Sequence, residues 1–314
     1  MENKKTKLLA VVGPTAGGKS ALALELSRRY GGEIISCDSM QIYKRMDIGT
    51  AKPTVEEMAQ VPHHMIDIVE PDCAFSSEDY VRLASERIAD CSARGVLPIV
   101  CGGTGLYLDA LLRGGNSAPI SDTSVLRAQL CERVEKEGIE PLYRELQEVD
   151  PESAEAIHPN NTKRVIRAME IYLSTGTTKS ELDRLSRQME SPYDFKVVGL
   201  FYKDREVLYK RIEKRVDIMI EQGLLDETKS LMDEGVFITN RTAAQAIGYK
   251  ELLGYVQGDM SLDDAVEELK KATRRYAKRQ MTWFSAKEYV QPLYADLKTF
   301  EEIVNNACQL FSLS

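Results

Sequence analysis

Short apolar runs separated by amphipathic stretches dominate the first half of the chain. Four of these runs are rich in β-branched residues and predict buried parallel strands, at 8–12, 33–37, 97–101 and 197–202. Between the first three runs apolar side chains recur at helical spacing, most clearly over 77–94. Strands that alternate with helices predict a doubly wound α/β core, with its ligand site at the carboxyl ends of the strands.

The segment from about 122 to 188 has a different pattern, because its amphipathic stretches follow one another without a strand signal. We interpret it as a helical insertion, since the run at 197–202 rejoins the core. Helical patterns then return at 206–222, 226–234 and 262–283, and in a short C-terminal helix. We expect a parallel-sheet core like that of P-loop nucleotide kinases. Its predicted parts are the first part of the core at 1–116, the helical insertion at 117–195, and the completion of the core with C-terminal helices at 196–314.

Residues 13–20 match the phosphate-binding pattern G-x-x-x-x-G-K-[ST], between the first predicted strand and a helical stretch at 21–30. In that context the backbone N–H groups of the turn and the positive end of the helix hold a diphosphate or triphosphate. Lys19 is expected to reach the outer phosphate, and the hydroxyl of Ser20 is the candidate ligand for Mg²⁺. The candidate diphosphate-binding residues are Gly13, Pro14, Thr15, Ala16, Gly17, Gly18, Lys19 and Ser20.

Composition limits the class of protein further. The chain of 314 residues has a net charge of −8, and its six cysteines are scattered without a C-x-x-C pair. This cysteine usage fits a reducing compartment, and no apolar run is long enough to predict a membrane span. The first residues lead directly into the first predicted strand, so we expect no cleavable signal and a cytoplasmic protein. Residues 270–279 nevertheless hold six basic residues and no acid, which predicts a positive face on an acidic protein.

Polar residues follow two of the predicted strands at the expected ligand edge. Asp38 closes the second strand and is a candidate general base, a Mg²⁺ ligand through water, or a cap of the next turn. At an ordinary pKa near ~4 it would be a weak base. Gln41 offers a donor and acceptors for a base edge, although a surface amide offers the same groups. Thr104, within the glycine-rich stretch 102–107, is either an anion ligand or part of a tight turn.

Two kinds of chemistry are disfavoured by the sequence. The run at 97–101 ends in glycine, whereas motor ATPases place an Asp after such a strand to hold Mg²⁺. This argues for group transfer from a phosphorylated donor rather than for an NTP-hydrolysing motor. His63, His64 and His158 have no accompanying cluster of ligand residues, so we do not expect them to bind a metal.

Basic residues outside the phosphate loop allow two interpretations each. On the helix at 206–222 they form a solvated face or supply one arginine that clamps a leaving diphosphate. Those at 163–167 form a solvated helix face or meet the phosphates of a nucleic acid. The stretch 274–284 mixes Arg and Lys with aromatic residues, as RNA-binding segments do, but an ordinary amphipathic helix has the same pattern.

Taken together, these features resemble the bacterial tRNA dimethylallyltransferase family, the isopentenyltransferases that modify the adenosine 3′ of the anticodon. The match covers nearly the whole chain, and the motifs around Asp38 and Lys52 are highly specific. The matching segments, in the order of the family, are 13–20, 36–43, 47–53, 62–67, 102–107, 158–161, 164–168, 246–251 and 278–283.

The resemblance implies that the phosphate loop holds dimethylallyl diphosphate rather than ATP. The target adenosine of tRNA would be flipped into a channel, where its exocyclic amine attacks the first carbon of the dimethylallyl group. By the same resemblance, Asp38 would accept a proton from the amine, while positive charge would stabilise the departing pyrophosphate. The implied catalytic residues are Asp38, Lys19, Thr104 and Arg215, with Mg²⁺ on Ser20.

The resemblance also implies that three segments hold the anticodon stem-loop of tRNA, with the helical insertion closing over it. The implied tRNA-binding residues are Asp38, Ser39, Met40, Gln41, Lys163, Arg164, Val165, Ile166, Arg167, Arg275, Lys278, Arg279 and Trp283. We expect Mg²⁺ as the cofactor and a monomeric protein. Two alternatives stay open. One is a P-loop small-molecule kinase or an adenylate isopentenyltransferase acting on free nucleotides, and the other is an RNA-binding protein with a regulatory nucleotide site.

Overall fold

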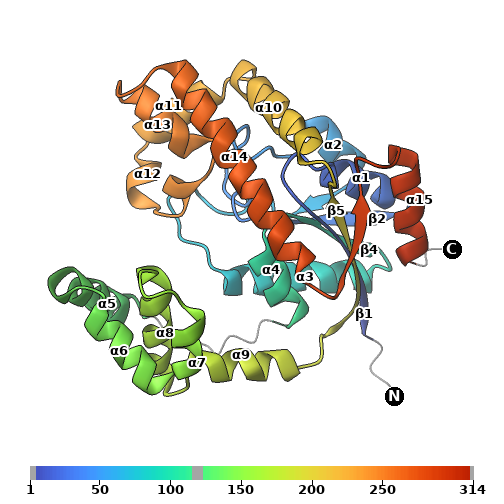
Figure 1. The fold of residues 1–314 in the computed structure, drawn as a ribbon. Coiled ribbons are helices and arrows are strands. Elements are labelled where there is room, and N and C mark those ends of the chain that lie inside the picture. The colour runs from blue at the N-terminus through green and yellow to red at the C-terminus, as the bar shows by residue number, and fades with distance from the viewer. Residues whose placement is uncertain (1–4, 115–122, 312–314) are drawn as a thin grey trace. The chain divides into compact units, whose positions relative to one another are not determined.

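The computed structural model describes residues 5–114 and 123–311, which form two compact units (Figure 1). One unit comprises the described residues up to Leu112 and from Pro192 onward, and the other spans Arg113–Ser191. The expected boundary at 116–117 lies outside the described residues. The expected end of the insertion at 195 is too late, because strand β5 begins at Tyr193 and pairs with the core.

A parallel sheet of six strands forms the centre of the first unit, in the order β3-β2-β4-β1-β5-β6. The central strand β1 pairs with β4 on one side and with β5 on the other, where Thr6 lies opposite Tyr193. The strands are β1 (Thr6–Val12), β2 (Gly32–Cys37), β3 (His63–His64), β4 (Leu97–Gly102), β5 (Tyr193–Phe201) and β6 (Val290–Tyr294).

The four strands predicted from the sequence are confirmed, but the two edge strands were not predicted. β3 has only two residues, too few to produce a recognisable pattern. β6 contains Pro292, which has no N–H to donate to a neighbouring strand. An edge strand tolerates this residue because it pairs on one side alone, and β6 pairs only with β5 among the described strands.

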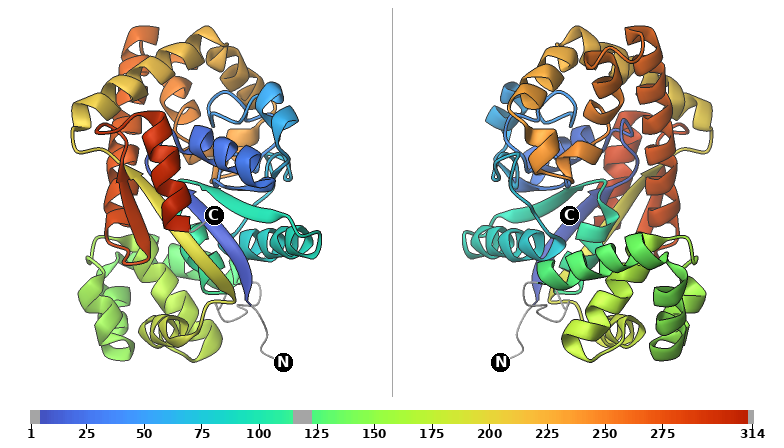
Figure 2. Two further views of the ribbon diagram at one scale, coloured as in Figure 1. Left: turned by 90° about the vertical axis from the view of Figure 1, so that its right-hand side faces the viewer. Right: turned by 90° about the vertical axis from the view of Figure 1, so that its left-hand side faces the viewer.

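Helices cover both faces of the sheet, as Figure 2 shows, and the alternation of side chains along the strands explains why. Leu9 and Val11 of β1 point to one face and pack with α1 and α15, whereas Leu8 and Ala10 point to the other and pack with α3 and α4. The predicted doubly wound core is therefore confirmed. These helices are α1 (Lys19–Tyr30), α3 (Ser77–Ala93), α4 (Gly105–Leu112) and α15 (Phe300–Phe311), and the short helix α2 (Val55–Gln60) precedes β3.

A further buried cluster joins the turn after β2 to helices from the C-terminal part of the chain. Ile42, Tyr43 and Met46 are fully buried in it, together with Tyr249 and Leu269. This packing fixes the chain that follows Asp38 between the sheet edge and those helices. The elements that complete the unit are α10 (Arg205–Glu221), α11 (Leu224–Asp233), α12 (Val236–Thr239), η1 (Ala243–Gln245), α13 (Tyr249–Val256) and α14 (Leu262–Ser285).

The second unit is entirely helical within the described residues and has its own apolar core, which includes Leu142, Leu146 and Val165. Its buried Glu170 is neutralised by ion pairs with Arg127 and Arg167. The helices are α5 (Ser124–Glu137), α6 (Glu140–Val149), α7 (Pro151–Ala156), α8 (Thr162–Thr175) and α9 (Lys179–Gln188). Among the described parts of the chain, no helix combines the length and apolar character needed to cross a membrane.

Candidate active site

A cavity of about 670 Å³ opens at the carboxyl ends of the strands in the first unit, as predicted for a doubly wound sheet. The phosphate loop, the end of β2 and the end of β4 form one side of it, and α10, α13 and α14 contribute the other. Six of its lining residues carry the chemistry discussed below: Lys19, Ser20, Asp38, Arg215, Arg275 and Arg279.

The phosphate loop adopts a conformation that its glycines make accessible. Gly13 and Gly18 have φ angles of 142° and 92°, which side chains rarely tolerate, and a Cβ on Gly13 would meet the carbonyl oxygen of Leu200 at 2.5 Å. The loop therefore needs glycine at both positions.

Side chains from elements far away in the sequence form hydrogen bonds with backbone groups of this loop. Arg211 of α10 donates to the carbonyl oxygen of Ala16 (2.9 Å), and the hydroxyl of Tyr202 donates to that of Gly17 (3.2 Å). The N–H of Thr15 donates to Oε1 of Gln280 on α14 (2.8 Å). The first N–H groups of α1 have no intrahelical partner and are available to an anion.

Lys19 and Ser20 begin α1 and both line the cavity. Burial lowers the pKa of Lys19 to about 8, so its ammonium group is poorly solvated and its charge is available to an anion. Nζ donates to the carbonyl oxygen of Pro14 (2.7 Å). The Ser20 hydroxyl makes no hydrogen bond to the described part of the chain and fits the predicted role of a Mg²⁺ ligand, because Mg²⁺ typically takes few protein ligands beside substrate phosphates.

Asp38 lines the cavity and caps a turn, so the predicted cap is confirmed, while its role as a base stays a prediction. Its Oδ1 accepts hydrogen bonds from the N–H groups of Met40 (2.9 Å) and Gln41 (3.4 Å). Oδ2 has no protein partner within the described residues. Burial raises the pKa of this carboxyl above its ordinary value, which makes Asp38 a stronger base than the sequence analysis expected.

Gln41 lines the cavity and is also held by hydrogen bonds within the protein. Its Oε1 accepts from the hydroxyl of Ser36 (2.8 Å), and its Nε2 donates to the carbonyl oxygens of Thr50 (3.2 Å) and Ala51 (3.1 Å). Through these hydrogen bonds Gln41 joins β2 to the turn 47–53, and its contact with RNA stays a prediction. Ser39 and Met40, beside it, also line the cavity.

The turn 47–53, a motif of the sequence analysis, is held by two charged residues. Lys52, nearly buried, pairs with Asp47 (2.5 Å) and with Asp67. Glu227 of α11 accepts from the N–H groups of residues 47, 48 and 49 and from the hydroxyl of Tyr249 (2.6 Å). These contacts fix the turn, whose residues Gly49, Thr50 and Ala51 line the cavity.

Thr104 contacts Ser39, which lines the cavity, and its contact with pyrophosphate stays a prediction. Its Oγ1 accepts from the N–H of Ser39 (3.0 Å) and lies 3.4 Å from the Ser39 hydroxyl. The residue thereby ties the end of β4 to the turn that carries Asp38. We assign it to positioning that turn.

Two arginines of α10 face the phosphate loop. Arg215, predicted as the clamp for the leaving group, lines the cavity, and burial followed by the neighbouring Arg211 lowers its pKa. Arg211 was not singled out by the sequence analysis, although it contacts the loop directly through Ala16. Neither guanidinium group forms an ion pair with the described residues, and Arg215, which lines the cavity, is available to a phosphate there.

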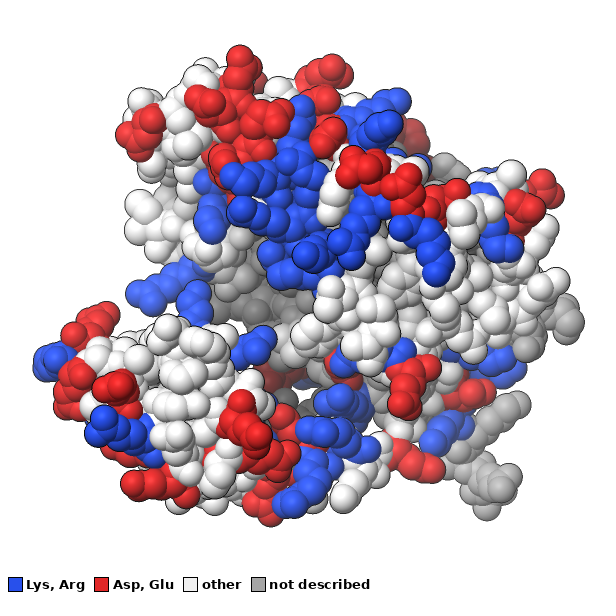
Figure 3. Space-filling view, in the orientation of Figure 1, with Lys and Arg blue, Asp and Glu red and all other residues white. Residues whose placement is uncertain are grey.

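The basic stretch of α14 divides into paired and unpaired cations. Lys270 pairs with Asp217 (2.9 Å), Lys271 with Glu268 (2.9 Å) and Arg274 with Glu213 (2.7 Å). Arg275, Lys278 and Arg279 make no ion pair with the described residues. Figure 3 shows Lys and Arg side chains gathered over α10 and α14, which is the predicted positive face. Of the predicted RNA contacts here, Arg275 and Arg279 line the cavity, while Lys278 and Trp283 lie outside it.

Gln280 is a site residue that sequence reasoning missed. It is 5% exposed, accepts from the N–H of Thr15, and donates through Nε2 to the carbonyl oxygen of Gly103 (3.0 Å). A Cβ on Gly103 would lie 2.0 Å from that Nε2, so glycine is required there. The sequence did carry one sign of this role, because Gln280 is a polar residue on the buried face of α14, four residues before Phe284.

We predict that Gln280→Met raises the KM for the phosphorylated donor about tenfold, with a smaller effect on kcat. Methionine keeps the length of the side chain but leaves the Thr15 N–H and the Gly103 carbonyl without partners. Steady-state kinetics will measure this. Gln245→Met, in the same cavity but without a bond to the loop, is the control, and equal donor KM values for the two variants would contradict the assignment.

The predicted RNA contacts at 163–167 belong to α8 in the second unit. Lys163 and Arg164 are exposed, as the prediction requires. Val165 and Ile166 are instead buried in the core of that unit, with exposures of 0% and 7%, so their side chains are unavailable to RNA. Arg167 pairs with Glu170 (3.0 Å). The motif therefore combines two surface cations with residues that build the helical core.

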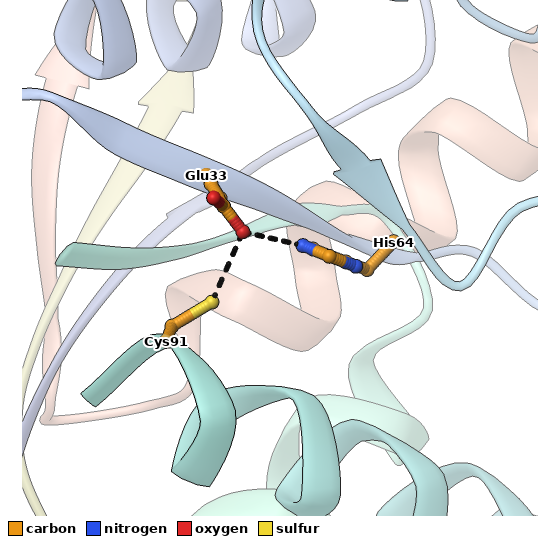
Figure 4. Close-up of side chains that lie close together, drawn as sticks. All are labelled: Glu33, His64 and Cys91. Atoms are coloured by element: carbon orange, nitrogen blue, oxygen red, sulfur yellow. Dashed lines mark hydrogen bonds and ion pairs between the residues drawn. The ribbon is translucent and has the colours of Figure 1, made fainter. Parts of the chain in front are cut away.

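A cluster of Glu33, His64 and Cys91 has the ligand types of a metal site (Figure 4). Both oxygens of Glu33 accept from Arg94 (2.7 Å each), and Oε2 also lies 2.7 Å from Nε2 of His64. Arg94 lowers the pKa of Glu33 to about 2, whereas burial raises that of Cys91 to about 11. A metal would have to displace Arg94 and deprotonate the thiol, so we interpret the cluster as an ion-pair network joining β2, β3 and α3.

The known proteins that the chain resembles belong to one enzyme family. A model of the family IPP transferase matches residues 41–287. The chain is 46% identical over 302 residues to the tRNA dimethylallyltransferase of Caldanaerobacter subterraneus subsp. tengcongensis, with 96% of each chain covered. It is 50% identical over 278 residues to that of Geobacillus thermodenitrificans, covering 88% of this chain and 87% of the relative.

Solved structures give the same result for the fold. The full-length tRNA isopentenylpyrophosphate transferase from Bacillus halodurans superimposes with a TM-score of 0.72 at 44% identity, covering 98% of this chain and 97% of that one. A eukaryotic dimethylallyltransferase acting on tRNA superimposes with a TM-score of 0.78 at 29% identity, covering 97% of this chain and 77% of that one.

Proposed function

Since the chain belongs to the IPP transferase family, we propose that it transfers a dimethylallyl group from dimethylallyl diphosphate to tRNA. The proposed acceptor is the exocyclic N6 amine of the adenosine 3′ of the anticodon, and the proposed by-product is pyrophosphate. The observation that carries the proposal is that one cavity contains both Lys19 of the phosphate loop and the half-buried Asp38, whose Oδ2 has no partner among the described residues. These groups would serve, respectively, a diphosphate donor and an amine acceptor.

In the proposed step, the N6 nitrogen forms a bond with the first carbon of the dimethylallyl group. The bond between that carbon and the bridging oxygen breaks, and its electrons leave with pyrophosphate. One proton of N6 passes to Oδ2 of Asp38, whose raised pKa favours accepting it. The turn hydrogen bonds to Oδ1 hold the carboxylate in place during this transfer.

Positively charged groups that line the cavity would stabilise the negative charge that develops on the leaving pyrophosphate. Lys19 and Arg215 line the cavity, and the N–H groups at the start of α1 add the positive end of the helix. Mg²⁺ held by Ser20, when bound, would neutralise further negative charge on the phosphate oxygens. We propose that the adenosine is flipped out of its stack to reach this point, because a stacked base cannot present N6 to an enclosed donor.

The proposed RNA contacts are Ser39, Met40 and Gln41 beside the acceptor, and three cations of α14 without an ion pair among the described residues, Arg275, Lys278 and Arg279. Lys163 and Arg164 in the helical unit, together with Trp283, complete the proposed set. We further propose that the protein acts as a monomer in the cytoplasm, which size-exclusion chromatography and fractionation of cells would check.

The proposed function is tested by incubating the pure protein with dimethylallyl diphosphate, Mg²⁺ and unmodified tRNA. Mass spectrometry of the digested RNA should find adenosine heavier by one dimethylallyl group. In parallel reactions, AMP and ATP replace tRNA as the acceptor. Prenylated free nucleotide instead of tRNA would move the function to adenylate isopentenyltransferases. ATP consumption without any prenyl product would overturn the assignment of the loop to a diphosphate donor.

We predict a bell-shaped pH dependence of kcat/KM for the donor. The acidic limb reports ionisation of Asp38, and its raised pKa moves that limb above the usual range of a carboxyl group. The alkaline limb lies near pH 8, because Lys19 has a pKa of about 8 and loses its charge as the pH rises through that value. A bound diphosphate stabilises the ammonium form, so the alkaline limb of kcat should shift upward. In Lys19→Arg the side chain keeps its charge at this pH, so the alkaline limb should move to higher pH. An unchanged alkaline limb would contradict its assignment to Lys19.

A further inference from the structure

Consecutive backbone N–H groups of the turn 47–53 converge on one carboxylate, that of Glu227 on α11. Its Oε2 accepts from the N–H groups of Asp47 (3.0 Å) and Ile48 (2.9 Å), and its Oε1 accepts from those of Ile48 and Gly49 (3.1 Å each). Oε1 also accepts from the hydroxyl of Tyr249 (2.6 Å). Successive N–H groups of a turn form a concave site for an anion, and here Glu227 occupies it. The conformation of the turn therefore depends on a side chain from another part of the fold.

A second set of hydrogen bonds connects this turn to Asp38. The side-chain amide of Gln41 donates to the carbonyl oxygens of Thr50 (3.2 Å) and Ala51 (3.1 Å) in the turn. The backbone N–H of the same residue donates to Oδ1 of Asp38 (3.4 Å). Gln41 thus bonds to the turn on one side and to the carboxylate on the other. A displacement of the turn would move Gln41 and disturb the position of Asp38.

Glu227 itself neither lines the cavity nor interacts electrostatically with Asp38. Within the described chain, the titratable side chains that do interact with the Asp38 carboxylate belong to other elements. They are Lys19 of α1, Cys37 of β2, Cys101 of β4, Tyr107 of α4 and Tyr276 of α14. An effect of Glu227 on the reaction would therefore pass through the position of the turn, and not through the charge of its carboxylate.

We propose that Glu227 is a positioning residue for prenyl transfer. By holding the turn 47–53 it keeps Gln41 in place, and through Gln41 it fixes the carboxylate of Asp38 where the proton of N6 is taken up. This inference rests on the proposed function, in which Asp38 is the base. Glutamine cannot substitute for Glu227, because every partner of the carboxylate is a donor, whereas an amide offers one acceptor oxygen and an NH₂ group that faces another N–H.

The test measures single-turnover transfer to tRNA at saturating tRNA and dimethylallyl diphosphate for Glu227→Gln in two backgrounds. In the wild-type background we expect the rate to fall about tenfold, because a displaced base takes the proton less efficiently. The Kd values for both substrates should stay within about threefold of the wild type, since Glu227 does not line the cavity. In the Asp38→Asn background we expect a further loss of less than about twofold, because the group that Glu227 positions is already absent.

Asp226→Asn is the matched control. It removes the same charge from the same first turn of α11, but the Asp226 carboxylate is exposed and has no partner among the described residues. Its single-turnover rate should equal that of the wild type. An equal loss of rate in Asp226→Asn and Glu227→Gln would assign the effect to the charge of α11 and would overturn the positioning role.

Gln41→Met interrupts the same path next to Asp38 and leaves the bonds between the turn and Glu227 intact. It replaces Glu227→Gln if circular dichroism shows that the latter does not fold. Methionine retains the length of the side chain and the backbone N–H but loses the bonds to Thr50 and Ala51. Saturating tRNA removes any effect of Gln41 on RNA binding from the measured rate. We expect a loss of rate that again disappears in the Asp38→Asn background.

The outcomes distinguish this inference from the proposed function. If the wild type transfers the prenyl group but Glu227→Gln has the wild-type rate, or loses the same factor in both backgrounds, Glu227 does not act through Asp38 and the inference is overturned. An Asp38→Asn variant with the wild-type rate would overturn the base and its positioning together, while transfer to tRNA stands. A wild-type protein that transfers nothing to tRNA would overturn the proposed function, and this inference with it.

Discussion

Asp38→Asn is expected to lower kcat for prenyl transfer by about 10²- to 10⁴-fold, the range that a general base contributes. The asparagine side-chain oxygen can still accept from the N–H groups of Met40 and Gln41, so the turn is retained. What is lost is the negative charge and the ability to take the proton of N6. Single-turnover measurements with saturating tRNA and donor report the chemical step directly.

Two controls separate this effect from a loss of structure or of binding. The Kd values for tRNA and for the donor should stay within about threefold of the wild type, because the substitution removes no proposed phosphate contact. Glu268→Gln changes an acid in the same cavity that is paired with Lys271, and it should retain most of the activity. If Asp38→Asn turned over at the wild-type rate, the proton would have another acceptor.

Lys19→Met is expected to lower kcat/KM for the donor by about 10²- to 10³-fold. This is the typical effect of removing one preorganised group that stabilises the charge developing in a transition state. The methionine retains the apolar stem but removes the ammonium group, whose low pKa reflects its poor solvation. Because the charge on the pyrophosphate grows as the bond to carbon breaks, part of the loss should appear in kcat rather than in KM alone.

Lys250→Met provides the matched control for this second variant. It removes the same charge from the same cavity, but at the α13 end, where Lys250 donates to Gln245. Its donor KM should remain near the wild-type value. A similar loss of kcat/KM in both variants would mean that the general positive potential of the cavity, not the position of Lys19, assists departure of the leaving group.

The sequence predicted those parts of the site that belong to short local patterns. The phosphate loop and Asp38 stand at strand ends that apolar runs reveal, and both lie in the cavity. Gln280 and Arg211 escaped prediction because their partners, Thr15 and Ala16, are far away in the chain and are contacted through backbone atoms, which carry no residue-specific signal.

The errors of the sequence analysis also have physical causes. Val165 and Ile166 lie within a basic motif, and a motif does not distinguish residues that contact a ligand from those that pack the helix supporting it. The edge strand β6 was hidden by its proline, whose effect depends on the position of the strand in the sheet.

The pairing of Thr6 with Tyr193 has a consequence for how the chain folds during synthesis. The central strand β1 emerges early from the ribosome, yet its neighbour β5 is made only after the whole helical unit. Closing so long a loop is slow, and until then one edge of β1 lacks its partner. The helical unit has a core of its own and can form in the meantime, which shortens the flexible chain that β5 must close. The inserted helices would thus speed the late step that completes the sheet.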